Sequence, residues 1–474
     1  MADDNILYYG DNLPILERHL PDESVDLVYL DPPFNSNATY NVLFGKADGT
    51  KAAAQIKAFD DTWHWDHVAA ETFQDVVTAG GDAAQAMMAF RTLLGTSTML
   101  AYLSMMAPRL IELRRVLKPT GSIYLHCDPK ASAHLRLLMD AIFGPKNFVN
   151  EIVWYYKTGG MSKRWFGRKH DVILFYAKGP NYKFTQHKEK SYIAHRYGFS
   201  NITVEEDEGG YFTMVGMRDV WGIPALRGNQ PEALGYPTQK PVAILERIIE
   251  ASTEPGDVVL DPFCGCGTAV AASEKLGRRW IGIDIAYLAV SLIKSRLTAM
   301  GSSAYKVLGE PTTTEDAAQL AADDPYQFQW WALGLIGARP QEGKKGADKG
   351  IDGRLYFFDE GNETPKQVVV SVKAGKVQAS HVRDLVGVLQ REQAQIGVLI
   401  SLNEPTQPMR EEAASASFYT SPWGRHPTIQ LLTIGELLDG KTIDMPAGGA
   451  HMTQVALPPV PERTVHPDQL SLGA

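Results

Sequence analysis

Two short segments, far apart in the chain, carry residue types suited to chemistry on a polar group. Asp31-Pro32-Pro33-Phe34 lies near the N-terminus, and Asp261-Pro262-Phe263-Cys264-Gly265-Cys266-Gly267-Thr268 follows more than two hundred residues later. The first offers a carboxylate, a carbonyl held by consecutive rigid prolines and an aromatic ring. The second is a glycine-rich turn that a ligand can approach closely.

The first segment suits the activation of an exocyclic amine of a nucleic-acid base, whose lone pair is delocalised into the ring. If Asp31 and the Pro32 carbonyl accept both amine hydrogens, the nitrogen becomes pyramidal and points its lone pair at an electrophilic methyl group. Phe34 offers a face for stacking. A base inside a duplex must first be flipped out, at a cost of a few kcal/mol. Considered alone, the segment has a simple turn after a strand as its alternative.

The second segment follows the strand-like residues 257–260 and precedes a helical pattern at 268–276. Gly265 and Gly267 allow a ligand near the backbone, and the cysteines between and before them are small enough to do the same. Cys-x-Cys without further Cys or His partners does not predict a zinc site. Asp284 ends the next strand-like run, where an acid can hold both ribose hydroxyls of a nucleoside cofactor.

Strand-like and helix-like patterns alternate between residues 6 and 300, which predicts a doubly wound α/β domain with a mostly parallel sheet. Strands are expected at 24–30, 121–126, 171–176, 257–260 and 280–283, and helices at 103–117, 131–142 and 242–252. Residues 181–234 depart from this rhythm, being polar, glycine-rich and aromatic, and are interpreted as an insertion that recognises a partner.

Together these features resemble the permuted, beta-group amino-methyltransferases of DNA over roughly residues 6–300, within an expected methyltransferase domain at 1–300. Further matches are Tyr9-Gly10-Asp11-Asn12, Leu125-His126-Cys127-Asp128 and Tyr236-Pro237-Thr238-Gln239-Lys240-Pro241. The resemblance implies a Rossmann-like fold, S-adenosylmethionine as cofactor, double-stranded DNA as partner and residues 181–234 as the target-recognition region. The acidic Asp-Pro-Pro-Phe form favours N6 of adenine, with N4 of cytosine as the alternative.

The resemblance also implies roles for individual residues. The catalytic set is Asp31, Pro32, Pro33 and Phe34. The cofactor-binding set is Asp11, Thr238, Lys240, Asp261, Phe263, Gly265, Gly267, Thr268 and Asp284.

A basic segment supplies a candidate DNA-facing surface although the net charge of the chain is −9. Its cations are Lys157, Lys163, Arg164, Arg168 and Lys169, interleaved with Tyr155, Tyr156, Trp165 and Phe166. Basic side chains suit phosphates and aromatic side chains suit bases. A solvated basic loop is the alternative.

After a predicted linker at residues 301–325, a second, smaller α/β domain is expected at 326–440, followed by a disordered tail at 441–474. Asp352 precedes one strand, and Ser371 and Lys373 end the next. This layout resembles the Mrr-like branch of the PD-(D/E)xK restriction endonucleases, which implies Mg²⁺ at Asp352 and a lysine that assists phosphodiester cleavage. Because Ser371 replaces the family's second carboxylate or amide, a domain that only binds DNA is the alternative.

Composition limits the remaining classes. The chain has 474 residues, 44% of them hydrophobic and 21% charged, as in an ordinary globular protein. Three cysteines give no disulfide framework, and no secretory leader or membrane span is expected, so the sequence predicts a cytoplasmic location. The sequence neither predicts nor excludes a homodimer.

The leading hypothesis is a site-specific DNA adenine N6-methyltransferase of a restriction-modification or phage-defence system, fused to a nuclease-like domain. The second is a solitary methyltransferase with a DNA-binding C-terminal domain. The third, a methyltransferase acting on RNA or on a protein amide, is disfavoured, because the protein-glutamine enzymes carry Asn-Pro-Pro-Tyr after the glycine loop.

Overall fold

The computed structural model describes residues 4–33, 38–45, 51–61, 64–157, 163–195, 203–227, 230–234, 236, 238–340, 350–357, 366–422 and 424–446. For residues 38–45, 51–61 and 339–340 it describes the course of the backbone alone. Within these ranges, none of the helices is both long and apolar enough to cross a membrane.

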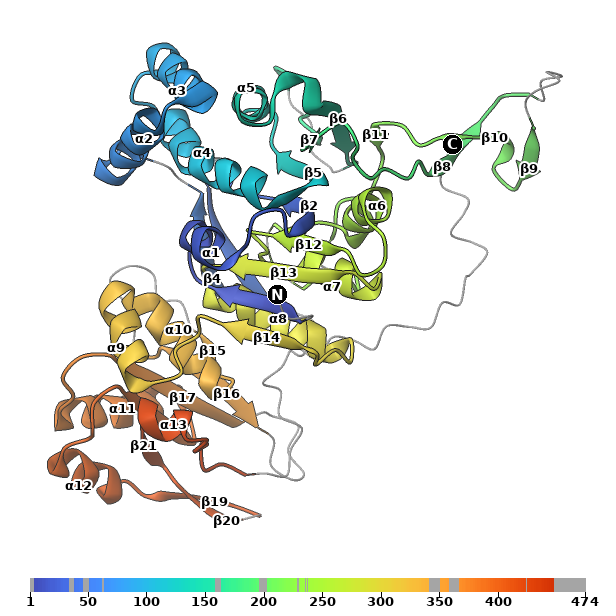
Figure 1. Cartoon of the computed structure of the whole chain (residues 1–474). Helices are drawn as coiled ribbons and strands as arrows, with labels where there is room; N and C mark the ends of the chain where they lie inside the picture. Colours follow the sequence, from blue (N-terminus) through green and yellow to red (C-terminus); the bar gives the residue numbers. More distant parts are fainter. Residues whose placement is uncertain are drawn as a thin grey trace.

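A nine-stranded sheet forms the centre of the N-terminal domain in the described part of the chain (Figure 1). In spatial order its strands are β11 (Val220–Trp221), β6 (Phe148–Tyr155), β7 (His170–Ala177), β5 (Leu117–Cys127), β2 (Val25–Leu30), β12 (Val258–Asp261), β13 (Arg279–Asp284), β1 (Asn5–Tyr9) and β14 (Tyr305–Leu308). Strand β7 runs antiparallel to β5 and β6, and the other pairings are parallel. The expected mostly parallel, doubly wound fold is confirmed.

Helices cover both faces of this sheet. The first face is covered by α1 (Asn12–His19), α2 (His67–Ala79), α3 (Gly81–Leu94), α4 (Thr98–Val116), α5 (Ser132–Phe143) and the short 3-10 helix η1 (Pro145–Asn147). The other face carries α6 (Val242–Ser252), α7 (Thr268–Lys275) and α8 (Tyr287–Ala299). Strand β2 is therefore buried on both sides, which explains its nearly continuous apolar sequence.

Between strands β2 and β12, the order in which successive strands are added to the sheet reverses. They are parallel neighbours, with Leu27 opposite Val259 and Val28 opposite Leu260. From β2 the order continues to β5, whereas from β12 it continues to β13 and β1. Open α/β sheets bind ligands outside the carboxyl ends of the strands at such a switch point. The Asp-Pro-Pro-Phe segment follows β2, and the glycine-rich turn follows β12.

Two smaller pieces stand beside the main sheet. Strands β3 (Ala38–Gly45) and β4 (Lys51–Asp61) form an antiparallel hairpin. The insertion expected at 181–234 contains a three-stranded sheet of β8 (Lys188–Tyr192), β10 (Gly210–Gly216) and β9 (Glu205–Asp207). This small sheet lies at the edge of the molecule, away from the main body, in Figure 1.

The C-terminal domain is a second α/β unit. Its sheet has the order β15 (Arg339–Pro340), β16 (Gly353–Phe357), β17 (Lys366–Lys373), β18 (Ile396–Ser401) and β21 (Ile429–Thr433). Its other elements are α9 (Thr314–Asp323), α10 (Pro325–Leu335), α11 (Ala379–Glu392), α12 (Gln407–Ser415), the hairpin β19 (Phe418–Ser421) with β20 (Gly424–Pro427), and α13 (Ile434–Leu438). A second α/β domain was expected here.

The structure differs from the expected linker and from part of the expected tail. In the segment 301–325, β14 extends the main sheet by pairing with β1, and α9 begins with a capping box at Thr313. In the tail, the Asp444 carboxylate lies 2.7 Å from His426 Nδ1, and its backbone carbonyl accepts from the Gln430 amide. Both segments are therefore packed, because their apolar residues complete the C-terminal core. Residues 447–474 lie outside the described ranges.

Candidate active site

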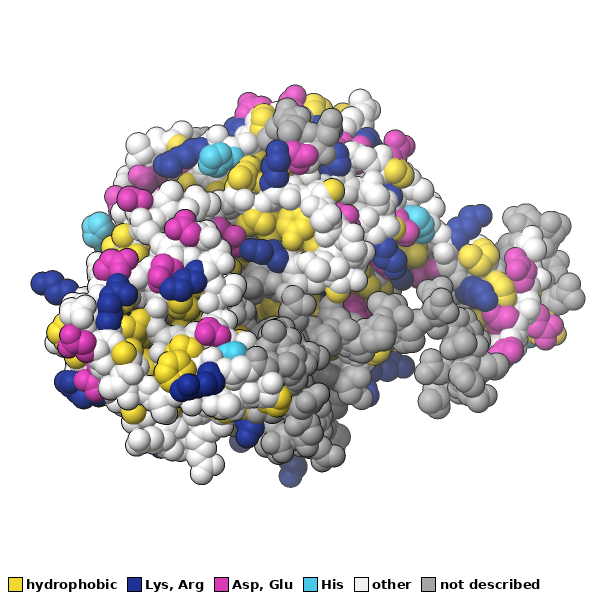
Figure 2. Space-filling model, turned by 90° about the horizontal axis from the view of Figure 1, so that it is seen from below, with side chains coloured by type: hydrophobic (Ala, Val, Ile, Leu, Met, Phe, Trp, Pro, Cys, Tyr) yellow, Lys and Arg dark blue, Asp and Glu magenta, His cyan; other side chains and the backbone are white. Residues whose placement is uncertain are grey.

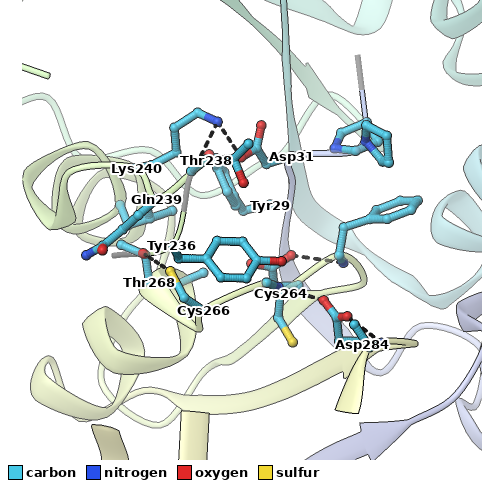
Figure 3. Close-up of a pocket in the computed structure, with 18 of the residues that line it drawn as sticks. Tyr29, Asp31, Tyr236, Thr238, Gln239, Lys240, Cys264, Cys266, Thr268 and Asp284 are labelled. Carbon is cyan, nitrogen blue, oxygen red and sulfur yellow. Dashed lines mark hydrogen bonds and ion pairs between the residues drawn. The ribbon is translucent and has the colours of Figure 1, made fainter. Parts of the chain in front are cut away.

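A pocket opens where the carboxyl ends of β2 and β12 meet, and both sequence segments line it (Figure 3). Asp31 follows β2 directly, and Asp261 is the last residue of β12. The lining residues are Tyr29, Asp31, Pro32, Pro33, Tyr236, Thr238, Gln239, Lys240, Leu245, Asp261, Phe263, Cys264, Gly265, Cys266, Thr268, Ala269, Asp284, Ile285 and Ala286. Segments far apart in the sequence are thus walls of one cavity.

The Asp31 carboxylate has two different oxygens. Oδ2 lies 2.5 Å from Lys240 Nζ, and the Lys240 and Asp31 side chains are 9% and 16% exposed. Oδ1 is buried and has no hydrogen-bond partner among the described residues. A buried acceptor without a donor is costly unless a ligand supplies one. The arrangement therefore fits an amine hydrogen of a bound base.

Of the other expected catalytic residues, Pro32 and Pro33 line the pocket. Phe34 lies outside the described residues. The Asn12 amide donates to the Pro262 carbonyl at 2.7 Å, which ties the first helix to the glycine turn.

The glycine turn needs its glycines for backbone and steric reasons. Gly265 has φ +48° and Gly267 φ +73°, a region that other residues avoid. A Cβ at Gly267 would lie 2.6 Å from Ile293 Cγ1. The Gly267 amide donates to the Cys264 carbonyl at 2.7 Å, closing the turn before α7. Gly267 shapes the turn from behind, whereas Gly265 lines the pocket.

Burial disfavours the charged forms of four groups in this region. It raises the pKa of Asp284 to about 6, although the Ala286 and Gly265 amides donate to its carboxylate. Burial also raises the pKa of Asp261 well above its ordinary value. The pKa values of the Cys264 and Cys266 thiols are raised for the same reason. In the part of the chain that is described, no three His, Cys, Asp or Glu side chains are grouped to hold a metal ion.

Most of the expected cofactor residues come together, and two do not touch the cavity. Thr238, Lys240, Asp261, Phe263, Gly265, Thr268 and Asp284 line the pocket, whereas Gly267 and Asp11 do not. Asp11 caps α1 by accepting from the Leu13 amide at 2.9 Å, and it pairs with Arg109 at 2.8 Å. Its carboxylate is thus engaged in the fold beside the site.

Sequence reasoning missed several lining residues. Ile285 follows the acid of β13 and is 59% exposed, an apolar surface suited to a flat ring. Tyr29 is in β2, two residues before Asp31, which follows the strand directly. Side chains two positions apart along an extended chain point to the same face of the sheet. That spacing was a usable signal. Tyr236 begins the matched segment 236–241 but was not in the expected cofactor-binding set, and it is buried against Gly265.

The basic segment is exposed, as a DNA-facing loop would be. Trp165 and Phe166 are 60% and 98% exposed, and the Arg168 guanidinium lies 5.9 Å from the Trp165 ring centroid. Lys157, Lys163, Arg164 and Arg168 are exposed, and Lys169 is partly buried. Lys157 also lines a surface groove with Tyr155, Tyr156 and Arg227. Exposed cations beside exposed rings fit a nucleic-acid backbone with unstacked bases.

The nuclease-like residues are together, but the carboxylate is occupied by protein donors. Asp352 Oδ1 accepts from Gln329 Nε2 at 2.9 Å, and Oδ2 accepts from Ser371 Oγ at 3.1 Å and from the Val372 amide at 2.6 Å. Lys373 Nζ is 3.8 Å from Oδ2. With serine as the second position, Asp352 is a single carboxylate that already accepts three hydrogen bonds. This geometry does not favour a Mg²⁺ site, which needs several open oxygen ligands.

A doubly wound sheet with an Asp-Pro-Pro segment and a glycine turn at its switch point is the arrangement expected of an amino-methyltransferase. Residues 25–295 match the N6_N4 family of DNA methylases, and residues 326–439 match a family described as NACHT-associated inactive restriction endonuclease 1. The first match covers more than half of the chain. The chain therefore belongs to this DNA methylase family.

Curated relatives agree with this assignment. The chain is 33% identical over 285 residues to the type II methyltransferase M.HpaI of Haemophilus parainfluenzae, covering 59% of this chain and 70% of that protein. It is 28% identical over 295 residues to the DNA adenine methyltransferase YhdJ of Escherichia coli K12, covering 59% of this chain and 78% of that protein.

Solved structures were also matched. The cytosine-N4-specific PvuII DNA methyltransferase is 17% identical with a TM-score of 0.38, covering 62% of this chain and 86% of that one. A DNA modification methylase of Thermus thermophilus, complexed with S-adenosylmethionine, is 16% identical with a TM-score of 0.37, covering 65% of this chain and 100% of that one.

The C-terminal match corrects one expectation. The domain matches a family described as inactive rather than an Mrr-like nuclease, and neither Mg²⁺ nor cleavage is supported. The physical reason is the lack of a second carboxylate at Ser371, together with the three protein hydrogen bonds that Asp352 already accepts.

Proposed function

We propose that this chain transfers a methyl group from S-adenosylmethionine to N6 of adenine at a specific sequence in double-stranded DNA. The observation that supports this most strongly is the Asp31 carboxylate. One of its oxygens pairs with Lys240, and the other is a buried acceptor in a pocket shared with the glycine turn. Adenine is favoured by the acidic form of the segment and by the adenine-specific name of one relative.

One set of pocket residues would bind the methyl donor, and another would bind the base that accepts the methyl group. When bound, S-adenosylmethionine supplies a methyl group on a positively charged sulfur. Asp284 would hold the ribose hydroxyls, and the open backbone at Gly265 would allow the cofactor to approach closely. Asp31 Oδ1 and the Pro32 carbonyl accept the two amine hydrogens of the flipped base. Held by these two acceptors, the nitrogen would present its lone pair to the cofactor side of the pocket.

DNA would be held by the basic segment and the insertion. Lys157, Lys163, Arg164, Arg168 and Lys169 would neutralise phosphates, and Trp165 and Phe166 would contact unstacked bases. Residues 181–234 would read the sequence, since their small sheet projects from the body of the methylase domain.

The experiment that tests the proposal compares Asp31→Ala with the unaltered chain. Methyl incorporation into DNA should fall by about 100- to 1000-fold, because an acceptor that orients the amine is lost. Affinity for S-adenosylmethionine, measured by calorimetry, should change little. Asp22→Ala is the matched control, because Asp22 is an exposed carboxylate paired with Arg115 away from the pocket. Unchanged incorporation in Asp31→Ala would refute the assignment.

Base identity is tested by sequencing DNA from cells that express the chain, with modified bases identified. N6-methyladenine within one short motif is expected. N4-methylcytosine would instead establish the alternative target. If the chain serves a restriction-modification or phage-defence system, as we propose, the methylated DNA should resist a restriction endonuclease of the same specificity.

For the C-terminal domain we propose a role without cleavage. Supercoiled plasmid incubated with the chain and Mg²⁺ should remain uncut, and Lys373→Ala should not alter that result. Figure 2 shows acidic and basic side chains interspersed on the visible face, without a single basic patch among the coloured residues. Weaker DNA retention in Lys376→Ala or Arg425→Ala, which remove exposed cations of this domain, at constant cofactor affinity would point to the DNA-binding alternative.

A further inference from the structure

A buried hydrogen-bonded chain runs from the wall of the active-site pocket into the sheet. Tyr29 Oη lies 3.0 Å from His126 Nδ1, and His126 Nε2 lies 3.2 Å from Asp171 Oδ2. The other carboxylate oxygen of Asp171 accepts from Tyr156 Oη at 3.2 Å. His126 is fully buried, whereas Tyr29 lines the pocket and is seen next to Asp31 in Figure 3. The roles proposed above for orienting the amine do not involve this series of hydrogen bonds.

The direction of these hydrogen bonds follows from the charge of Asp171. Burial alone would raise the pKa of Asp171, but the hydrogen bond from His126, the charge of Lys240 and the hydrogen bond from Tyr156 lower the pKa overall. Asp171 is therefore a carboxylate and can only accept. His126 Nε2 must carry the hydrogen that points to it, so in the neutral ring Nδ1 is an acceptor. Tyr29 then donates to Nδ1, and its oxygen lone pairs are left to accept a hydrogen.

Methyl transfer to an amine creates a proton that must leave. The nitrogen lone pair forms the new N–C bond, so the nitrogen is positively charged until one of its N–H bonds breaks and returns an electron pair. Asp31 Oδ1 holds one amine hydrogen and is therefore the first group that the proton reaches. Its neighbour Lys240 is a cation that cannot take the proton from it. A neutral imidazole backed by a carboxylate is the kind of base that accepts protons in enzymes.

We propose that Tyr29, His126 and Asp171 form a relay that takes up the proton released by the methylated amine. This proposal rests on the proposed transfer to an exocyclic amine, whether of adenine or cytosine. The N–H bond whose hydrogen Asp31 Oδ1 holds breaks, its electron pair returns to the nitrogen, and the proton passes to Asp31. Asp31 then passes the proton to Tyr29 Oη while the Tyr29 hydroxyl proton passes to His126 Nδ1. His126 becomes an imidazolium stabilised by Asp171, and it returns the proton through Tyr29 to solvent when the product leaves.

The surroundings support a concerted transfer. Burial, together with the charges of Asp31, Asp261 and Asp171, raises the pKa of Tyr29 well above its ordinary value. Tyr29 therefore cannot hold a stable negative charge and must gain one proton as it gives up another. The titratable groups that face this network from the surrounding elements are Asp31, Asp128, Tyr156, Lys240 and Asp261. Trp154 covers the His126 ring edge-on, with ring centroids 5.5 Å apart.

The test measures single-turnover methyl transfer by the full chain on duplex DNA that carries the motif found in cells. The variants are Tyr29→Phe, which removes the first acceptor beyond Asp31, and His126→Asn, which can accept from Tyr29 but cannot take up a proton. We expect the rate to fall by about 10- to 100-fold in each variant. The rate should also rise more steeply with pH than in the unaltered chain, because solvent bases replace His126, and the solvent deuterium isotope effect should change.

Tyr124→Phe is the matched control. It removes another buried tyrosine hydroxyl, which lies 2.7 Å from Ser252 Oγ and outside this network. Its rate and pH profile should match the unaltered chain, and all variants should bind S-adenosylmethionine normally. A fall in rate with an unchanged pH profile and isotope effect would mean that the network only positions Tyr29, and no fall would refute the relay. If the unaltered chain itself incorporates no methyl group, the proposed function fails instead.

Discussion

Lys240 and Asp31 show how strongly the role of one residue depends on its neighbours. The sequence resemblance groups Lys240 with cofactor-binding residues, but its Nζ lies 2.5 Å from Asp31 Oδ2. The two side chains are nearly buried, so each needs the other to offset lost hydration. At the residue scale, Lys240 is therefore expected to position the Asp31 carboxylate, for which we propose the role of orienting the amine.

Replacing Lys240 by methionine tests this role. The change leaves the Asp31 carboxylate buried without its cation, so the free energy of unfolding should fall by about 3 kcal/mol. The single-turnover rate should fall by at least about tenfold at saturating cofactor, while cofactor affinity changes little. Lys275→Met, at an exposed ion pair with Glu246, serves as the control. A large loss of cofactor affinity with an unchanged rate would return Lys240 to the cofactor-binding set.

Asp284 predicts a pH dependence of cofactor binding. Its pKa is raised to about 6 in the folded protein, so the carboxylate is protonated below that pH and ionised above it. If the ionised form accepts the ribose hydroxyls, affinity for S-adenosylmethionine should fall by about tenfold per pH unit below about pH 6. Calorimetric titration from about pH 5 to about pH 8 measures this dependence. Asp284→Asn should bind more weakly at neutral pH, with a flatter profile.

The raised pKa of Asp284 also makes the stability of the folded chain depend on pH. Because the folded-state pKa lies above the ordinary value of 3.8, the folded chain binds this proton more tightly than the unfolded chain does. The contribution of Asp284 to stability is therefore present at low pH and is lost as the pH rises through about 6. Asp284→Asn should remove this part of the pH dependence in denaturant unfolding.

At the scale of elements, the turn between β12 and α7 joins the cofactor side of the pocket to the sheet. Gly265 and Gly267 have positive φ, and only Gly267 also lacks room for a side chain. The turn is thus fixed by backbone conformation and by the packing of α8 behind it. A helix that begins directly after such a turn offers its first amides to a ligand.

Gly267→Ala should destabilise the protein more than a substitution at a merely strained glycine. The left-handed conformation costs about 1–2 kcal/mol, and the overlap with Ile293 adds about 1–3 kcal/mol. Gly277→Ala is the matched control, because Gly277 has φ +69° but nothing within 4 Å of the added Cβ. Denaturant unfolding of the cofactor-free chain measures both. Equal losses would show that Ile293 moves aside and that the packing argument is wrong.

At the scale of the whole molecule, the two domains share a hydrophobic core. Leu7 and Trp280 of the main sheet belong to the same cluster as Trp331 of α10 and Val370 of β17. The Gln327 side chain on α10 accepts from the Tyr287 amide at 3.1 Å. Another residue of this helix, Trp330, packs against the cluster of Tyr236 and Cys266 beside the pocket. The C-terminal domain therefore supports a wall of the active site.

We expect the two domains to unfold in one cooperative transition, because separating them would expose this shared core. Trp331→Ala, at a side chain that is 1% exposed, should lower the free energy of unfolding by about 3–5 kcal/mol. Calorimetry and intrinsic fluorescence should report the same midpoint in the unaltered chain. Phe418→Ala is the control, because Phe418 is half exposed on a hairpin of the C-terminal domain. Two separate transitions would show that the domains are independent.

The sequence by itself determined the class of fold, the two segments that carry the site and the family they resemble. Alternating apolar strands and amphipathic helices follow from local periodicity, and Asp31, the glycine turn and Asp284 stand at strand ends that periodicity locates. These are local properties, so one chain without any structure was enough to find them.

The tertiary structure alone decided which residues meet. In the folded chain, strands β2 and β12 are neighbours, and Lys240 contacts Asp31. Asp11 pairs with Arg109, and Tyr29 lies beside the buried His126. In the structure, the segment expected to be a linker contains β14 and α9. Their apolar residues pack against a core that joins both domains. Such contacts join residues as far apart in the sequence as Asp31 and Lys240, and no local pattern records them.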